Sequence, residues 1–309
     1  MSCTVLGGGV SGLSTGIRLL EMGLEVRLVA ERLSPGTVSD TAAAWWYPFL
    51  VEPLIKTNRW SSESFVEFVR LKEEEGLEFI TMRMGREYLK QSCGTPGWSE
   101  SINHFRILEK NEIIDGYSFG WEIEAPVIEM MHYMPWLRSR FELLGGSIET
   151  RKISDFDELE SDLIVNCSGL GARDICHDEE VVPVRGQVVY IKQDPGFGRY
   201  DQRPESLIYT IPRRDVTVLG GTAQKGDWTT EIREEDEEDI LQKCELLWPE
   251  LDRSKIVGRA VGLRPSRTEI RLEKEHVHGR DIIHNYGHGG AGVTLSWGCA
   301  DEVSKLVGL

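Results

Sequence analysis

Three glycines near the N-terminus have the spacing of a loop that binds a pair of phosphates. Gly7, Gly9 and Gly12 form a GxGxxG pattern between a short apolar run and a segment of helical periodicity. Glu31 lies nineteen residues beyond Gly12, where a carboxylate can accept hydrogen bonds from ribose hydroxyls. Helix N-termini bind anions because their first N–H groups have no partner within the helix. We therefore predict a dinucleotide site, and the acid at position 31, although Arg32 follows it, argues against NADP.

A second glycine-rich run, IIHNYGHGGAG, occupies residues 282–292. Five of the six positions from 287 to 292 are glycine or alanine, so the backbone there can pack against a flat or anionic group. A helix predicted to begin near Gly292 offers a second N-terminus, suited to a polarised carbonyl of a ring system. The pattern alone also fits a tight turn without a ligand.

Both runs need secondary structure to position them. Residues 4–6 and 24–30 read as strands, and the apolar spacing of Leu13, Ile17 and Leu20 predicts a helix between them. This strand–loop–helix–strand unit is the opening of a Rossmann-type fold. Further along, the patterns predict helices over 61–75, 127–144, 234–247 and 292–307, and short strands within 80–125. They also predict strands over 162–169, 184–192 and 282–283, and two strands within 206–220 around a turn at Arg213–Asp215. The helix from Val127 is expected to bury Val127, Met130, Met131, Met134, Leu137 and Phe141.

Because cofactor-type segments stand at both ends of the 309 residues, we expect an α/β fold with a discontinuous dinucleotide-binding domain and an inserted sheet-rich domain. The predicted division assigns residues 1–50, 127–175 and 258–309 to the dinucleotide-binding domain. Residues 51–126 and 176–257 then form the substrate domain.

The composition excludes several classes of protein. A net charge of −16 argues against binding to nucleic acid, which needs clustered Lys and Arg. No apolar run reaches the ~20 residues of a membrane span, and the glycine loop begins so early that we expect no signal peptide. The six scattered cysteines, without a CxxC pair, indicate reduced thiols and a cytoplasmic protein. The histidines His276, His278, His284 and His288 lack the paired spacing with acids that a closed metal site requires, so we expect no metal.

The C-terminal run also carries a resemblance to a known family. IIHNYGHGGAGVTLSWGCA matches every specified position of the signature of the D-amino-acid oxidase family. The similarity extends over essentially the whole chain, through AAAWWYPFLVEP, DLIVNCSGLGAR, PVRGQ, TVLGGT, DW and VGLRPSR. It resembles most the short bacterial members, and it implies a Rossmann-type FAD-binding domain with an inserted antiparallel-sheet substrate domain.

The resemblance implies roles for three residues at the substrate. Arg264 in GLRP resembles the arginine that grips the substrate carboxylate, and a guanidinium can make two parallel charge-assisted bonds to such a group. Tyr209 in LIYTIP resembles a tyrosine that hydrogen-bonds the same carboxylate. The backbone carbonyl of Gly290 is expected to receive the substrate ammonium.

The substrate pocket departs from the family pattern. Many members carry a second tyrosine four residues before the one matched by Tyr209, and this chain has Glu205 there, so Tyr200 is the candidate to swing in as a lid. Ala291 replaces a bulky aromatic of the vertebrate members. The other pocket residues that the resemblance implies are Trp46, Tyr47 and Arg203.

The resemblance also assigns cofactor contacts along the chain. Thr37–Ser39 align with a polar loop near the phosphates and ring, Lys152–Ile153 with the backbone that holds the adenine, and Ser168–Gly169 with the adenosine side. The full predicted FAD-binding set is Gly7, Gly9, Val10, Ser11, Gly12, Glu31, Arg32, Thr37, Val38, Ser39, Lys152, Ile153, Ser168, Gly169, Gly289, Gly290, Gly292, Val293 and Thr294.

The activity that the resemblance implies is FAD-dependent oxidative deamination of D-amino acids to 2-oxo acids, ammonia and hydrogen peroxide, by hydride transfer from the substrate α carbon to flavin N5. The expected partners are a small-molecule D-amino acid and dioxygen, and a homodimer stays open. Neutral side chains are preferred over D-aspartate, because D-aspartate oxidases carry an arginine where this chain has Ala223. The alternatives are a D-aspartate oxidase, a glycine- or sarcosine-type amine oxidase, and a nucleotide-binding sensor without turnover.

Overall fold

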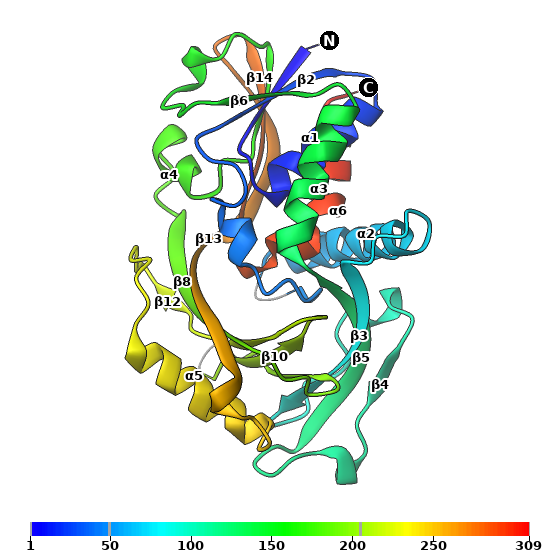
Figure 1. The fold of residues 1–309 in the computed structure, drawn as a ribbon. Helices are drawn as coiled ribbons and strands as arrows, with labels where there is room; N and C mark the ends of the chain where they lie inside the picture. The colour runs from blue at the N-terminus through cyan, green and yellow to red at the C-terminus, as the bar shows by residue number, and fades with distance from the viewer. Residues whose placement is uncertain (1, 49–50, 204–205, 309) are drawn as a thin grey trace.

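The structure is a computed structural model that describes residues 2–48, 51–203 and 206–308, and it has two parts that share one mixed sheet (Figure 1). The first part contains β1 (Ser2–Leu6), β2 (Glu25–Ala30), β6 (Ser147–Thr150), β7 (Leu163–Asn166) and β14 (Arg280–His288). The second part contains β3 (Ile80–Leu89), β4 (Phe105–Ile107), β5 (Phe119–Ile128), β9 (Gly198–Asp201), β10 (Ile208–Pro212), β11 (Thr217–Gly220) and β12 (Gln224–Lys225), while β8 (Val182–Ile191) and β13 (Ile256–Val277) join the two. The helices are α1 (Val10–Glu21), α2 (Leu54–Glu73), α3 (Met130–Leu143), α4 (Ala172–Ile175), α5 (Glu234–Leu247) and α6 (Gly292–Leu306). The predicted α/β class is confirmed.

The first part is the predicted Rossmann-type unit. Its strands run parallel in the order β14-β7-β1-β2-β6, with Thr4 paired to Arg27 on one side and to Ile164 on the other. Helix α1 packs between α3 and α6, as Figure 1 shows. Because β1 ends at Leu6 and α1 begins at Val10, the glycine loop is the turn at the carboxyl end of β1, which is where open parallel sheets bind their ligands.

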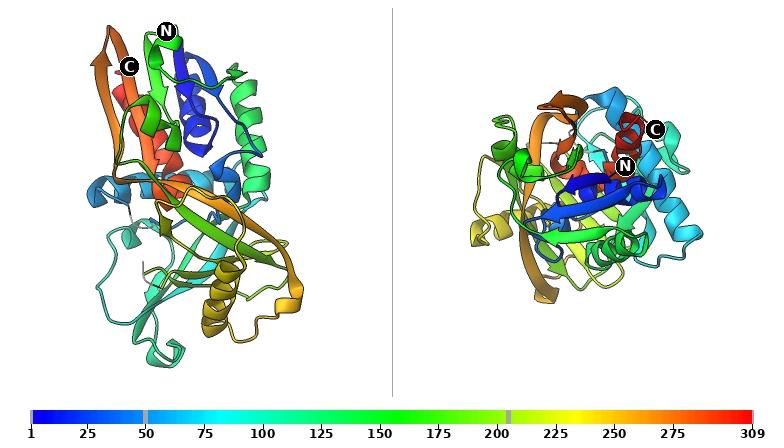
Figure 2. Two further views of the ribbon diagram at one scale, coloured as in Figure 1. Left: turned by 90° about the vertical axis from the view of Figure 1, so that its left-hand side faces the viewer. Right: turned by 90° about the horizontal axis from the view of Figure 1, so that it is seen from above.

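The two long strands β8 and β13 connect this unit to the second part. β13 has 22 residues, pairs with β8 along one stretch and with β14 along the next, and runs through both parts in Figures 1 and 2. Beyond β8 the sheet continues as β11-β10-β9-β3-β5-β4, antiparallel except where β9 meets β3. Helix α5 covers this sheet through an apolar cluster that includes Ile240, Leu241 and Cys244. The exact division into domains stays a prediction, because β13 runs through both parts.

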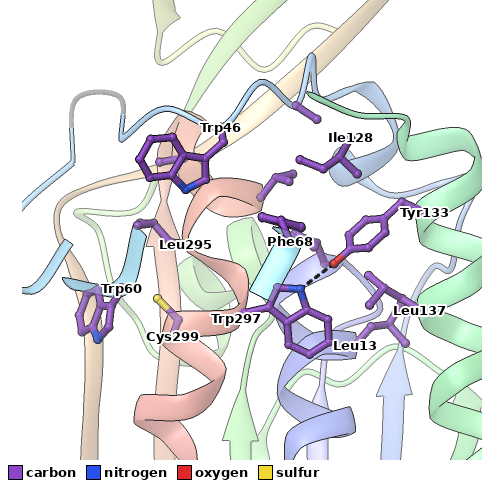
Figure 3. Close-up of a cluster of buried hydrophobic side chains, with 14 of the residues drawn as sticks. Leu13, Trp46, Trp60, Phe68, Ile128, Tyr133, Leu137, Leu295, Trp297 and Cys299 are labelled. Carbon is purple, nitrogen blue, oxygen red and sulfur yellow. Dashed lines mark hydrogen bonds between the residues drawn. The ribbon is translucent and has the colours of Figure 1, made fainter. Parts of the chain in front are cut away.

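A dense aromatic core holds α6 in place (Figure 3). Trp297 on α6 is buried and its Nε1 donates to the Tyr133 hydroxyl on α3 at 2.8 Å. On the other side, α6 approaches α2 at Gly298, where a Cβ would lie 2.2 Å from the Trp60 carbonyl oxygen. Close packing of this kind leaves little room for movement, so the N-terminus of α6 has a fixed position.

One helix begins later than its sequence pattern predicts. The apolar spacing predicted a helix from Val127, but Val127 lies in β5, where it pairs with Thr81, and α3 begins at Met130. Met131, expected on the buried face, is 78% exposed. Strand residues buried on both faces can match helical spacing over a few positions. Here the pairing of β5 with β3 keeps Val127 in a strand.

Other elements are longer than predicted. The helix expected over 61–75 begins seven residues earlier, at Leu54, directly after Pro53. β3 and β5 have 10 residues each, where short strands were predicted. The helix over 234–247 and the strand pair about the Arg213–Asp215 turn are confirmed. No helix among the described residues is long and apolar enough to cross a membrane.

Candidate active site

A cavity of about 1040 Å³ runs between the two parts, a volume that suits a ligand of cofactor size. Its walls come from the glycine loop, the segment after β2, the start of α6 and the strands β8, β9, β10 and β13. Of the predicted residues, those that line it are Gly7, Gly9, Val10, Ser11, Glu31, Arg32, Thr37, Val38, Ser39, Tyr47, Lys152, Ile153, Ser168, Gly169, Tyr200, Tyr209, Arg264, Gly289, Gly290, Gly292, Val293 and Thr294. The structure thus brings residues from across the whole chain to one cavity, and their individual contacts stay predictions.

The glycine loop is built so that a side chain cannot enter it. Gly7 has φ +122°, and a Cβ there would lie 2.3 Å from the Cys167 carbonyl oxygen. A Cβ on Gly12 would lie 1.9 Å from the carbonyl oxygen of Gly7. The first turn of α1 carries no acidic residue, and only the Ser39 hydroxyl accepts from its first N–H, that of Val10, at 3.0 Å. The helix N-terminus therefore presents polar backbone and a positive dipole end to the cavity, which fits a pyrophosphate.

The start of α6 forms another wall of the cavity. Gly289 has φ +54°, and Gly290 is exposed. The Thr294 hydroxyl accepts from the Tyr47 N–H at 3.2 Å and donates to the Tyr47 carbonyl at 3.1 Å. These two hydrogen bonds join the segment after β2 to α6, so two walls of the cavity are connected to each other.

Arg264, in the GLRP segment of β13, lines the cavity. Its Nη1 donates to the Thr222 carbonyl at 2.8 Å, and among the described residues no carboxylate forms an ion pair with it. By contrast, Arg185 on the neighbouring strand is fully buried and paired to Asp236 at 2.5 Å. A guanidinium without an acid partner has donors available for a carboxylate in the cavity.

Tyr209 lies beside Arg264 at the same end of the cavity. Its ring lies over Gly220 of the neighbouring strand β11, where an added Cβ would be 2.1 Å from Tyr209 Cζ. Burial raises the pKa of Tyr209, and the nearby Arg264 charge only partly opposes this effect. The hydroxyl is therefore protonated at neutral pH and can donate a hydrogen bond to an anion in the cavity.

Gly186 on β8 creates the space for this guanidinium. A Cβ at Gly186 would lie 2.4 Å from both Nη1 and Nη2 of Arg264. We expect Gly186→Ala to displace the Arg264 guanidinium and so to weaken binding of propionate, a small carboxylate probe, about 100-fold, because a displacement of about 1 Å at a binding group has effects of this size. The dissociation constant of propionate is measured by fluorescence titration. Gly258→Ala on β13 is the control, since a Cβ there meets nothing closer than Tyr190 Cδ2 at 3.4 Å, and equal affinity in both variants would contradict the prediction.

Three predicted pocket residues do not line the cavity. Trp46 is fully buried in the core of Figure 3, where its Nε1 donates to the Ser61 carbonyl at 2.9 Å, and the adjacent Trp45 lines the cavity instead. Ala291 is fully buried. Arg203 is paired with Asp201 at 2.6 Å. Neighbouring residues of an extended segment point to opposite sides, so a shift of one residue decides which tryptophan lines the cavity.

The structure bears differently on the roles predicted for Tyr200 and Gly12 and on position 205. Tyr200 does line the cavity: it is 2% exposed on β9, its ring stacks on Trp45 with centroids 4.9 Å apart, and its role as a lid stays a prediction. Glu205, where the family's second tyrosine would stand, lies outside the described residues. Gly12 does not line the cavity either, and its role is the close packing of loop and helix described above.

Sequence reasoning missed several cavity residues. Trp45 and Gly186 were inside quoted motifs, AAAWWYPFLVEP and PVRGQ, but nothing in the motifs says which member faces a ligand. Trp228 and Thr230 reach the cavity from the loop after β12. His288 also lines it, although no histidine was expected there. Burial lowers the pKa of His288 to about 4, so this ring is neutral at physiological pH.

The histidines and acids of the described chain form pairs and no larger metal-binding group. His276 contacts Asp281 at 2.9 Å and His284 contacts Glu275 at 2.8 Å. Within residues 2–48, 51–203 and 206–308, no three His, Cys, Asp or Glu side chains are arranged to hold a metal ion.

The parallel sheet, the glycine loop and the long cavity lined by Arg264 are features of a dinucleotide-dependent enzyme. The chain belongs to the family of FAD-dependent oxidoreductases, whose model matches residues 2–306. It is 40% identical over 311 residues to a D-amino-acid oxidase of Rubrobacter xylanophilus, covering 98% of this chain and 95% of that protein. It is also 34% identical to human D-aspartate oxidase, covering 98% and 93%. Its fold is similar to that of a glycine oxidase from Bacillus cereus, with a TM-score of 0.81 at 18% identity over 99% of this chain and 94% of that one.

Proposed function

We propose that this protein is a D-amino-acid oxidase, which converts D-amino acids to 2-oxo acids, ammonia and hydrogen peroxide with FAD as cofactor. The observation that carries the proposal is Arg264, a guanidinium that faces the cavity without an acid partner among the described residues. An amino acid's carboxylate supplies the missing partner. The relatives named above support the same reaction class.

The chain's own residues divide the work of binding and orientation. Gly7, Gly9 and the α1 N-terminus would hold the pyrophosphate of FAD, and Glu31 the ribose of its adenosine half. The N-terminus of α6 would face the flavin ring. When bound, FAD supplies the acceptor for the hydride that leaves the substrate α carbon.

The substrate would lie between the flavin ring and the sheet of the second part. Arg264 and Tyr209 bind its carboxylate, and the carbonyl of Gly290 receives its amino group, which must lose a proton before the hydride leaves. With both groups held, the α hydrogen has one orientation, and such positioning is a large part of catalysis. Neither Arg264 nor Tyr209 has to transfer a proton in this arrangement.

Neutral D-amino acids are the proposed substrates. A dicarboxylic substrate such as D-aspartate needs a second cation for its side chain, and position 223, an arginine in D-aspartate oxidases, is the exposed Ala223. Arg203 is the other candidate for this second cation, and it already pairs with Asp201 through its Nε at 2.9 Å and its Nη2 at 2.6 Å. D-aspartate oxidation is therefore the alternative that the substrate test below must separate.

The setting of the reaction completes the proposal. Dioxygen would be the electron acceptor, and the cytoplasm the compartment, which fits six cysteines that are all free thiols. A homodimer is the assembly that a measurement of solution mass would test. A sensor without turnover would hold the nucleotide and leave Arg264 without a purpose.

Anaerobic mixing tests the function directly. The purified yellow holoenzyme is mixed with D-alanine, L-alanine, glycine, sarcosine or D-aspartate without oxygen, and flavin absorbance is followed. We expect D-alanine to bleach the flavin rapidly and L-alanine to leave it oxidised. Bleaching by D-aspartate alone, or by glycine and sarcosine alone, would replace the proposal with the corresponding alternative, and no bleaching by any of them would favour the sensor.

A further inference from the structure

Three aromatic side chains, which we call the aromatic wall, line the cavity together with Arg264 and Tyr209. These are Trp45, Tyr47 and Tyr200. Trp45 Nε1 and the Tyr200 hydroxyl are buried and have no hydrogen-bond partner in the described chain. Burying such groups without a partner is costly, about 1–3 kcal/mol each, so the wall is a place where the polarity of a ligand's side chain matters.

Glu87 on β3 lies directly behind the aromatic wall. It stands opposite Tyr200 of β9 in the sheet register, and it is only 6% exposed. Its Oε2 accepts no hydrogen bond, and among the described residues no lysine or arginine pairs with it. Burial raises the pKa of Glu87 to about 7, an effect that a hydrogen bond donated by the Tyr47 hydroxyl partly opposes.

The groups that face Glu87 do not neutralise it. From the neighbouring elements these are Tyr47, Cys93, Trp121, Tyr200 and Asp201, and none of them carries a positive charge. The charge of Glu87 helps to raise the pKa of both wall tyrosines, so its field reaches the side chains that line the cavity. Asp201 is itself held by Arg203 and by the Tyr117 hydroxyl at 2.9 Å. The wall therefore has an uncompensated negative charge behind it whenever Glu87 is ionised.

We infer, resting on the proposed function, that Glu87 is a specificity-determining residue that excludes D-amino acids with an acidic side chain. Arg264 and Tyr209 can hold one carboxylate. A second carboxylate in the same cavity meets repulsion from Glu87 across a wall of low dielectric, where charges act over longer distances than in water. A neutral side chain meets no such repulsion.

This exclusion has a defined dependence on pH. Glu87 is charged above about pH 7 and becomes neutral as the pH falls through that value, whereas the side chain of D-aspartate, with a pKa of about 3.9, stays ionised. Repulsion is therefore present above pH 7 and is lost below it. The ratio of kcat/KM for D-aspartate to that for D-alanine should rise about tenfold from about pH 8.5 to about pH 6 in the unmodified holoenzyme. The amino group cancels in this ratio, because both substrates carry it.

A binding measurement makes the test independent of turnover. Succinate and propionate are D-aspartate and D-alanine without the amino group, so they cannot be oxidised in the same way. Calorimetric dissociation constants for the two, at both pH values, should show the same tenfold change in ratio. If this change appears while no amino acid is oxidised, the inference holds and the proposed function fails. If D-alanine is oxidised but both ratios are constant with pH, the inference fails and the function stands.

A pair of variants completes the experiment. Glu87→Gln should raise the D-aspartate to D-alanine ratio about tenfold at pH 8.5 and abolish its change with pH. Glu122→Gln is the matched control, because Glu122 on the next strand is also buried but is paired with Arg86 at 2.7 Å and Arg106 at 2.8 Å. Its ratio should keep the pH dependence of the unmodified enzyme. Equal behaviour of the two variants would overturn the inference, and if Glu87→Gln does not fold, the binding ratios of the unmodified protein decide.

Discussion

Arg264→Ala should lower kcat/KM for D-alanine by about 1000-fold, because removing one partner of a buried charge pair costs about 2–5 kcal/mol and leaves the other uncompensated. In the proposed complex the other partner is the substrate carboxylate, which would lose the cation that Arg264 supplies. FAD should still bind, since Arg264 lies at the substrate end, with Tyr209. Steady-state oxygen consumption measures the loss, and flavin absorbance measures the retained cofactor.

Two controls make this result specific. Arg264→Lys keeps the charge but cannot form two parallel bonds, so it should recover only a part of the activity. Arg267→Ala removes an arginine three residues along the same strand, paired with Asp178 at 2.9 Å and outside the cavity lining. Folded Arg267→Ala should retain most activity. If Arg264→Ala were no less active than Arg267→Ala, the carboxylate site would have to lie elsewhere.

Gly12→Ala should abolish stable binding of FAD. The added Cβ would lie 1.9 Å from the Gly7 carbonyl oxygen, so the loop or α1 must move, at a cost of about 1–3 kcal/mol in packing. The same movement misplaces the N–H groups at the start of α1, and we expect affinity for FAD to fall about 100-fold. The ratio of flavin to protein absorbance after gel filtration, followed by titration of added FAD, measures this.

Gly258→Ala is again the matched control, because it adds the same methyl group at a position with space for it. It should keep its flavin and its thermal stability. A Gly12→Ala protein that retains stoichiometric FAD would mean that the loop does not bind the pyrophosphate. If Gly12→Ala is unfolded by circular dichroism, added FAD that restores folding would still measure the weakened binding.

Sequence patterns predicted an element correctly where the residues that signal it and the residues that form it belong to the same short segment. The glycine loop between β1 and α1 needs backbone without side chains, and glycine spacing records this directly. The bounds of helix α5 and the turn between β10 and β11 were predicted correctly, because the residues that signal them are neighbours in the sequence. β13 was not predicted as a single strand, because its 22 residues pair with β8 and β14, which are distant in the chain.

The sequence by itself determined the glycine loop, the family and two side chains, Arg264 and Tyr209, that line the same cavity. Only the tertiary structure decided that Trp45 and not Trp46 lines the cavity, that Arg203 pairs with Asp201, and that Glu87 stands behind the aromatic wall. The physical reason is that these three outcomes depend on the side of a strand and on the partner across it. Side-chain direction alternates along an extended chain, and the partner comes from a segment far away in sequence, so neither can be obtained from a motif.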